Sequence, residues 1–224
     1  TDVLMSRTEH RPVATNRIPP KHALVFGTIS ILLGLLIAYF LFNVATAALI
    51  LLGAVSYLFV YTLYLKPRTY WNIVIGGIAG VFPALAGWAA VTGSIGWPSI
   101  YIGLLVFLWT PPHFWGLSLK FKEDYVKSGY PMLSVVKSQK QVINWIVWST
   151  IPLLAFSLLP IAIHSLGSFD IGYYLLAIGL GIAFIAVDYK MLKNPTVENG
   201  FRAFLFSLPY LFILFGAMIV SSII

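Results

Sequence analysis

The residues best suited to chemistry in this sequence are charged side chains in three short segments between long apolar stretches. The first segment, TDVLMSRTEHRP (residues 1–12), carries the carboxylate of Asp2 followed by Arg7 and Arg11. The two arginines are one helical turn apart and can face the same way. Guanidinium groups bind phosphate in a bidentate manner, so this segment is a candidate anion site. Alternatively, the arginines only flank a membrane-spanning helix on its cytoplasmic side.

The second segment, YLKPRTYWN, places Lys66 and Arg68 on either side of Pro67 in a predicted turn. Two cations in such a turn can hold an anion over the end of a helical bundle. A short basic turn is also what membrane topology requires, so both interpretations stay open.

The third segment, KFKEDYVKSGYPML (residues 120–133), holds Lys120, Lys122 and Asp124, which is followed by Tyr125. If the preceding helix continues through it, Lys120 and Asp124 are four residues apart and lie on one face. The Gly-Tyr-Pro sequence that follows ends the helix, and apolar residues return the chain to the membrane surface. A charged helix and a returning loop predict a cap over a cavity. A solvated face with local ion pairs is the alternative.

One histidine, His113, lies inside an apolar stretch, in the sequence WTPPHFW (residues 109–115). Pro111 and Pro112 predict a kink there, because neither has a backbone N–H and the carbonyl groups left free need other partners. An ionisable residue within a membrane-spanning helix is a candidate functional residue. A structural histidine bonded to those carbonyl groups is the competing interpretation.

Together, the three segments predict a cation-rich mouth with carboxylates above an apolar cavity. Carboxylates beside phosphate-seeking cations are explained if Mg²⁺ bridges them, because Mg²⁺ favours one or two carboxylates plus substrate phosphate oxygens. This combination indicates a substrate with a diphosphate head and a lipid tail. A transporter would also place charges at a cavity, but its helices are usually broken near the midplane and its halves paired. Only one broken helix is predicted here.

The elements that must position these residues are membrane-spanning helices. Hydrophobic residues make up 59% of the chain, charged residues only 9%, and the mean hydropathy is +0.90, values typical of membrane proteins. The Gly76 and Gly80 pair predicts close helix packing. We expect an all-α polytopic membrane protein with seven transmembrane helices, each of about 20 residues. The predicted spans are 22–42, 44–65, 72–92, 99–119, 141–163, 171–190 and 202–223, with Asn43 in a tight turn and Asn194, Pro195 and Gly200 ending the sixth span.

The distribution of charge supports this count. With seven spans, all fourteen lysines and arginines fall on one side of the bundle, which is then the cytoplasmic side. Because these residues are dispersed between apolar runs, the net charge of +7 does not indicate a nucleic-acid partner. The chain has no cysteine, which excludes disulfides and thiolate chemistry. We expect an integral multi-pass protein of a prokaryotic cell membrane rather than of the mitochondrial inner membrane.

Three stretches resemble the UbiA-type intramembrane prenyltransferases: DVLMSRTEHRP, YTLYLKPRTYWNIVIGGIAGVFPALAGWAAVTG and FLWTPPHFWGLSLKFKEDYVKSGYPML. The resemblance is specific from residue 2 to about residue 140 and rests elsewhere on hydrophobic spans. The sequence PPHFW is typical of the branch that acts on heme rather than on quinone or chlorophyll precursors. One departure is Ser134, where the family usually has the last proline of Pro-Met-Leu-Pro, and we expect it to alter loop stiffness rather than chemistry.

The resemblance implies a nine-helix bundle with two aspartate-bearing motifs on cytoplasmic loops, which bind Mg²⁺ and a prenyl diphosphate. Residues 5–12 match the signature that follows the first motif, so Asp2 corresponds to the last aspartate of that motif. Asp124 and Tyr125 are the nearest equivalents of the second motif. The chain is then expected to be a single domain over residues 1–224 that lacks the first two helices and most of the first motif.

The resemblance also implies the reaction: transfer of a farnesyl group from farnesyl diphosphate to the 2-vinyl group of heme b, giving heme O for terminal oxidase assembly. In that reading Asp2 and Asp124 hold Mg²⁺, the expected cofactor. Tyr125 orients a metal ligand or a diphosphate oxygen, and His113 contacts heme or its water. The cations that would neutralise the leaving diphosphate are Arg7, Arg11, Lys66, Arg68, Lys120 and Lys122.

The expected partners are heme b, farnesyl diphosphate and membrane lipid, with heme A synthase or terminal oxidase assembly proteins as candidate protein partners. Two alternatives remain. One is a UbiA-type enzyme that acts on a quinone precursor or an archaeal lipid. The other is a transporter or assembly factor without catalytic activity.

Overall fold

The computed structural model describes residues 2–222, and every regular element in that range is helical. Within these residues, seven segments are long and apolar enough to cross a membrane, which confirms the predicted number. In chain order they are α1 (Pro20–Ile37) continued by η2 (Ala38–Phe42); α2 (Val44–Val55) continued by η3 (Ser56–Leu65); α3 (Asn72–Gly76), η4 (Gly77–Gly80) and α4 (Val81–Thr92); α5 (Trp97–Lys120); α8 (Gln139–Ser157) followed by η5 (Leu159–Ile161); α9 (Ile171–Lys193); and α10 (Val197–Ser221).

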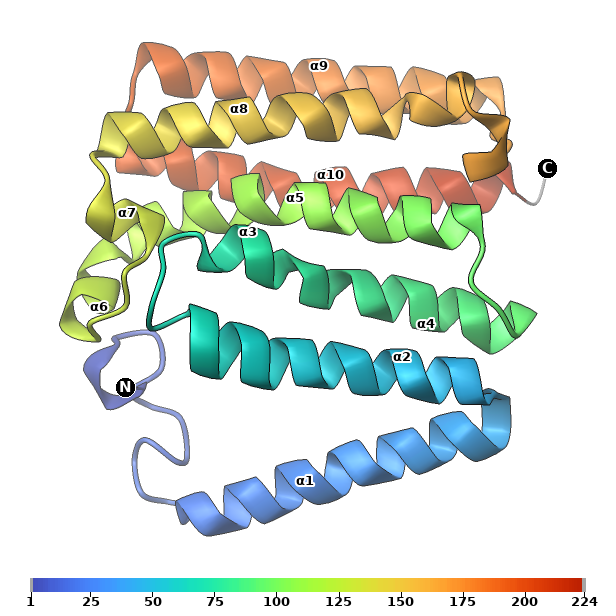
Figure 1. Ribbon diagram of the computed structural model, residues 1–224. Helices are drawn as coiled ribbons and strands as arrows, with labels where there is room; N and C mark the ends of the chain where they lie inside the picture. The colour runs from blue at the N-terminus through green and yellow to red at the C-terminus, as the bar shows by residue number, and fades with distance from the viewer. Residues whose placement is uncertain (1, 223–224) are drawn as a thin grey trace.

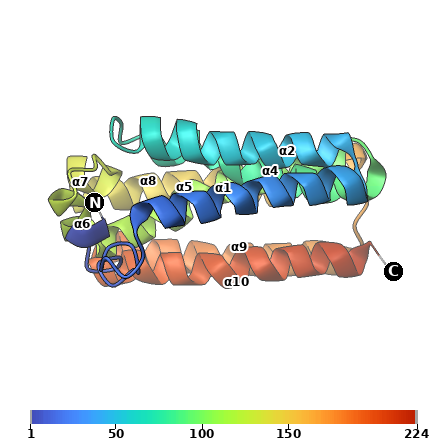
Figure 2. The ribbon, with the colours of Figure 1, turned by 90° about the horizontal axis from the view of Figure 1, so that it is seen from below.

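Three short helical elements gather at one end of this bundle (Figures 1 and 2). They are η1 (Asp2–Leu4), α6 (Lys122–Lys127) and α7 (Leu133–Val136), whereas η6 (His164–Leu166) precedes α9. Because successive long helices alternate in direction, the segments that carry the fourteen basic residues all lie at the end with α6 and α7 (Figure 1). The charged segments of the sequence are therefore neighbours in space.

Local capping groups set the helix boundaries. The side chain of Asn43 accepts a hydrogen bond from the N–H of Thr46 at 2.8 Å, which begins α2 at the turn predicted there. Thr196 caps α10 in the same way, through the N–H of Asn199 at 3.2 Å. The last span therefore begins at residue 197 and not at the predicted residue 202. Its first turn is polar, but the cap from Thr196 stabilises it as helix.

The prediction that Gly200 ends the sixth span is wrong, since Gly200 lies inside α10. Its role is in packing. A Cβ at this position would lie 2.6 Å from Leu119 Cδ1, and a Cβ at Gly116 would lie 2.6 Å from the carbonyl oxygen of Gly200. The two glycines thus let α5 and α10 approach closely.

Helix α5 is the centre of the bundle and contacts α4, α8 and α10. It runs through Pro111 and Pro112 as one helix, with both prolines buried. The helix breaks only at Phe121, where the backbone has φ −104° and ψ 26°, so α6 is a separate helix. By contrast, α1 buries none of its side chains in this structure, and Figure 1 shows it diverging from α2 toward its N-terminal end.

Candidate active site

Hydrogen bonds from the N-terminal segment hold the carboxylate of Asp124. Asp124 lies on α6 with 6% of its surface exposed. Its Oδ2 accepts hydrogen bonds from Ser6 Oγ at 2.8 Å and from the backbone N–H of Arg7 at 3.4 Å. Burial by itself would raise the pKa of this carboxyl group, but the bonds from Ser6 and Arg7 outweigh it, and the pKa lies below its usual value. Asp124 is therefore ionised at neutral pH.

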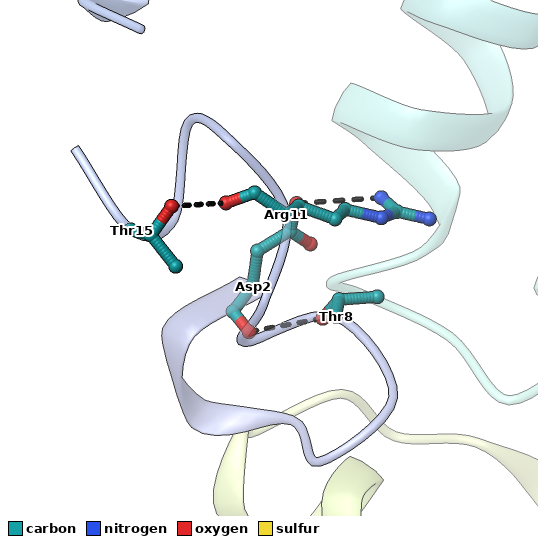
Figure 3. Close-up of polar contacts among 4 residues, drawn as sticks. All are labelled: Asp2, Thr8, Arg11 and Thr15. Carbon is teal, nitrogen blue, oxygen red and sulfur yellow. Dashed lines mark hydrogen bonds and ion pairs between the residues drawn. The ribbon is translucent and has the colours of Figure 1, made fainter. Parts of the chain in front are cut away.

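The second carboxylate, Asp2, is paired within its own segment (Figure 3). Arg11 Nη1 lies 3.3 Å from Asp2 Oδ2, in an ion pair that is about half exposed on both sides. The hydroxyl of Thr8 donates to the carbonyl oxygen of Asp2 at 2.9 Å, and that of Thr15 donates to the carbonyl oxygen of Arg11 at 3.1 Å. These bonds fold the segment into compact turns that carry Asp2 and both arginines to the same end of the bundle.

Lys66 adds a third cation to this end. Its ammonium group lies 4.6 Å from the centre of the Tyr130 ring. Burial lowers the pKa of Lys66, the nearby charges of Arg7 and Arg11 lower it further, and Asp2 opposes them. The structure thus brings three predicted cations and two predicted carboxylates together. We call Asp2, Arg7, Arg11, Lys66 and Asp124 the mouth.

Tyr125 packs beneath the N-terminal segment, next to Asp124 of the mouth. Its side chain is 2% exposed and packs in an apolar cluster with Met5 and Met132, which joins the N-terminal segment to the loop after α6. Burial raises the pKa of its phenol, with Arg7 lowering it and Asp124 raising it. Tyr125 is therefore a neutral hydrogen-bonding group beside the carboxylate of Asp124.

Two predicted diphosphate ligands, Arg68 and Lys120, have partners outside the mouth, and a third, Lys122, is exposed. Arg68 donates to the carbonyl oxygens of Leu63 and Tyr64, each at 3.0 Å, and so caps the end of η3. Lys120 lies 4.5 Å from the centre of the Phe201 ring, toward α10. Lys122, the first residue of α6, is exposed. The break at Phe121 turns α6 away from α5, so Lys120 and Asp124 do not share the predicted helix face.

His113 lies in the contact between α5 and α10. Its ring stacks on Trp109 at 3.9 Å and lies tilted against Phe204 at 4.6 Å, both measured between centroids. Its Nδ1 is 2.7 Å from Ser207 Oγ. The histidine thus has partners in two helices, among side chains that do not line the cavity described next.

An apolar groove of about 590 Å³ begins beside the mouth. Its lining is mainly apolar, and the hydroxyl of Thr110, one of the lining residues, already donates to the carbonyl oxygen of Val106 at 2.7 Å. Such a groove suits a hydrocarbon chain. The lining residues are Leu49, Ile50, Gly53, Ala54, Tyr57, Tyr61, Ile73, Gly76, Gly77, Ala79, Gly80, Phe82, Pro83, Thr110 and Phe114.

Two aromatic residues connect the groove to the mouth. Tyr61 lines the groove and lies within electrostatic range of Arg7 and Tyr125. Phe114 also lines the groove and packs against the apolar cluster of Tyr125 and Met5. An amphiphile can therefore place its anionic head among the cations while its tail enters the groove.

The arrangement offers two carboxylates for a metal ion. Across residues 2–222, no group of three or more His, Asp or Glu side chains could hold one. The hydrogen bonds from Ser6 Oγ and from the N–H of Arg7 both end on Asp124 Oδ2. Asp2 and Asp124 fit a divalent ion only if oxygens of an anionic substrate complete its coordination.

Sequence reasoning missed Ser6, Tyr61 and Phe114. Each lies next to residues that were predicted to belong to the site: Ser6 precedes Arg7, Tyr61 precedes the basic turn, and Phe114 follows His113. Only Phe114 had a signal that could have found it, because it lies one residue beyond His113 and faces another side of the helix.

The site thus combines a cation-rich mouth with an apolar groove, an arrangement that suits a lipid with an anionic head. The chain belongs to the UbiA prenyltransferase family, whose model matches residues 1–216. The match extends well beyond the stretch in which the motifs were recognised. Enzymes of this family generally use a divalent metal, in keeping with the two carboxylates of the mouth.

Its relatives narrow the class further. The chain is 40% identical over 232 residues to the protoheme IX farnesyltransferase of Acidiphilium cryptum (strain JF-5), with 100% of this chain and 72% of that protein covered. It is 41% identical over 224 residues to the protoheme IX farnesyltransferase of Marinobacter nauticus, with 100% and 73% covered. The enzyme of that name from Teredinibacter turnerae is 42% identical over 220 residues, with 98% and 70% covered. No solved structure matches the chain.

Proposed function

We propose that this protein transfers a farnesyl group from farnesyl diphosphate to a vinyl group of protoheme IX, giving heme O. The observation that carries the proposal is the apolar groove that opens directly beside a mouth of three cations and two carboxylates. The similarity to protoheme IX farnesyltransferases over the whole chain supports the choice of donor and acceptor.

The reaction begins with cleavage of the allylic C1–O bond, whose electron pair leaves with the diphosphate. The π electrons of the vinyl group then form the new bond to C1. Water adds to the cation left on the porphyrin side chain and loses a proton, which produces the hydroxyl group. None of these steps requires an oxidant or a reductant.

The residues of the mouth act on the leaving group. Arg7, Arg11 and Lys66 stabilise the charge that develops on the diphosphate, and they are already in place before the bond breaks. We assign Asp2 and Asp124 as ligands of Mg²⁺, which would add further neutralising charge. The neutral phenol of Tyr125 can donate to a diphosphate oxygen. Water is kept from the allylic cation by the apolar wall of the groove.

The same proposal places the mouth on the cytoplasmic side of a prokaryotic cell membrane, because lysine and arginine favour cytoplasmic loops. Membrane lipid then surrounds the outer faces of the seven helices. Assembly proteins of terminal oxidases, or heme A synthase, are the protein partners that a heme O product would require.

The test is a product assay on membranes that contain the protein, supplied with protoheme, farnesyl diphosphate and Mg²⁺, with the porphyrins identified by mass. We expect heme O from the unaltered protein and none from Asp124→Ala. The matched control is Glu123→Ala, which removes the adjacent carboxylate on α6, an exposed one. Full activity in Asp124→Ala would exclude the assigned role of Asp124. Prenylation of a quinone precursor in place of protoheme would overturn the choice of acceptor.

A further inference from the structure

Tyr61 and Phe114 lie where the charged mouth meets the apolar groove, on walls contributed by η3 and α5. Tyr61 is within electrostatic range of Arg7, and Phe114 contacts the cluster that contains Tyr125. Both rings also pack against the apolar core around Trp115. We call these two rings the neck.

The backbone around Tyr61 fixes its ring. Tyr61 belongs to a ten-residue π-helix, η3, a conformation that is rare and often found at functional sites. A Cβ at Gly76 would overlap the Tyr61 ring, so the glycine is what allows the ring to approach α3 closely. On the other side, the ring of Tyr57 lies 5.7 Å away between centroids. The ring of Tyr61 thus has little freedom to turn out of the groove.

The motif PPHFW fixes Phe114. His113 is bound to α10 through Ser207 and stacks on Trp109. Because successive residues of a helix are rotated by about 100°, this contact turns Phe114 toward the groove. The residue of the motif that lines the groove is therefore the phenylalanine, and the histidine links α5 to α10.

The position of the neck matches one atom of the substrate. With the diphosphate among the cations of the mouth and the tail in the groove, C1 lies between the two, beside the neck. When the C1–O bond breaks, positive charge develops at C1 and is shared with C3 of the allyl group. The face of an aromatic ring carries negative charge and attracts a cation, most strongly where water is excluded.

We infer that Tyr61 and Phe114 are catalytic residues that stabilise the allylic cation through the faces of their rings. The inference rests on the proposed function, since it assumes an allylic diphosphate in this site. The interaction exists only after the bond has begun to break. Loss of either ring face should therefore lower kcat and kcat/KM together and leave KM for farnesyl diphosphate unchanged.

The test replaces Phe114 with phenylalanines that carry one, two and three fluorine atoms. Fluorine withdraws charge from the ring face and changes the shape of the side chain little. We expect kcat to fall stepwise, by up to about 30-fold in total, the equivalent of a desolvated cation–π contact of about 2 kcal/mol. The matched control is the same series at Phe82, a ring that lines the groove from α4, and there kcat should not change.

Tyr61 is tested by two substitutions. Tyr61→Phe keeps the ring and should keep most of the rate, whereas Tyr61→Leu should lose about 30-fold in kcat by the same reasoning. Binding of an unreactive thio analogue of farnesyl diphosphate reports whether each variant retains a folded site.

The outcomes separate the two proposals. A stepwise fall at Phe114 with none at Phe82 supports the neck. An unchanged kcat across the Phe114 series, or an equal fall at both positions, overturns it while the proposed function stands. If the unaltered protein forms no farnesylated porphyrin at all, the proposed function itself fails.

Discussion

The hydrogen bond between Ser6 and Asp124 should control how firmly the N-terminal segment docks on α6. Ser6→Ala removes the 2.8 Å bond to Oδ2 and leaves the bonds from the backbone N–H groups of Ser6 and Arg7, the latter 3.4 Å long. A hydrogen bond to a charged group contributes about 1.5–3 kcal/mol, and the lower value applies because Ser6 is exposed. About 1.5 kcal/mol corresponds to roughly a tenfold increase in the population of the undocked segment.

Limited proteolysis measures this population. Trypsin cleaves after Arg7 only when the segment leaves its turn, in which the N–H of Thr8 bonds to the carbonyl oxygen of Met5 at 2.9 Å. In nanodiscs, with opening fast relative to cleavage, the rate follows the undocked population. We expect about tenfold faster cleavage in Ser6→Ala. The control is Thr15→Ala, which removes bonds to Arg11 and Pro12 within the segment but none to α6.

The same variant should raise KM for farnesyl diphosphate, because Arg7 and Arg11 leave the mouth together with the segment. Unchanged cleavage in Ser6→Ala, or equal acceleration in Thr15→Ala, would show that the bond to Asp124 does not hold the segment. A double-mutant cycle with Asp124→Asn adds a direct measure of the coupling between the two side chains.

The remaining predictions concern His113 and Lys66. His113→Ala removes a ring that is packed between Trp109 and Phe204, so we expect the free energy of unfolding to fall by about 1–3 kcal/mol. The thermal midpoint should be lower, and KM for both substrates should be unchanged. A selective loss of heme affinity would contradict this prediction. The pKa of Lys66 is lower in the folded protein than in the unfolded chain. Between these two pKa values the unfolded chain binds more protons, so the free energy of unfolding rises with pH. As the pH rises, inhibition by inorganic diphosphate should therefore weaken at a lower pH than it would if Lys66 had the pKa of an exposed lysine. In Lys66→Arg the weakening should occur at a higher pH, because arginine stays charged.

The fold was largely predictable because long runs of apolar residues mark every membrane-spanning helix along the chain. A bilayer demands about 20 apolar residues per helix, and each predicted span overlaps an observed one. The errors lie at polar helix ends, such as the first turn of α10, where composition suggests a loop but a capped helix forms. Gly200 was misread because a glycine that ends a helix and one that admits a neighbouring helix look alike in sequence.

The charged part of the site was predictable in outline and not in detail. Residue type places Asp2, Asp124 and the arginines at one end of the bundle, since charge is expelled from the membrane. Side-chain direction depends on partners far along the chain, which the sequence does not reveal. Arg68 turns to its own helix, and Lys120 turns to Phe201 of α10. Tyr61 could not be found for a simpler reason: aromatic residues make up 16% of this chain, so one more tyrosine carries no signal.

The bond between Ser6 and Asp124 joins residues 118 positions apart, and this separation has a consequence for biosynthesis. A ribosome adds about 5–20 residues per second, so the N-terminal segment waits roughly 6–24 s for its partner to be made. During that time four hydrophobic helices enter the bilayer while the first carboxylate of the mouth has no second. In this state Ser6 and Arg7 have no carboxylate on α6 to bond. The N-terminal segment can therefore dock only after α5 has been inserted and α6 has left the ribosome.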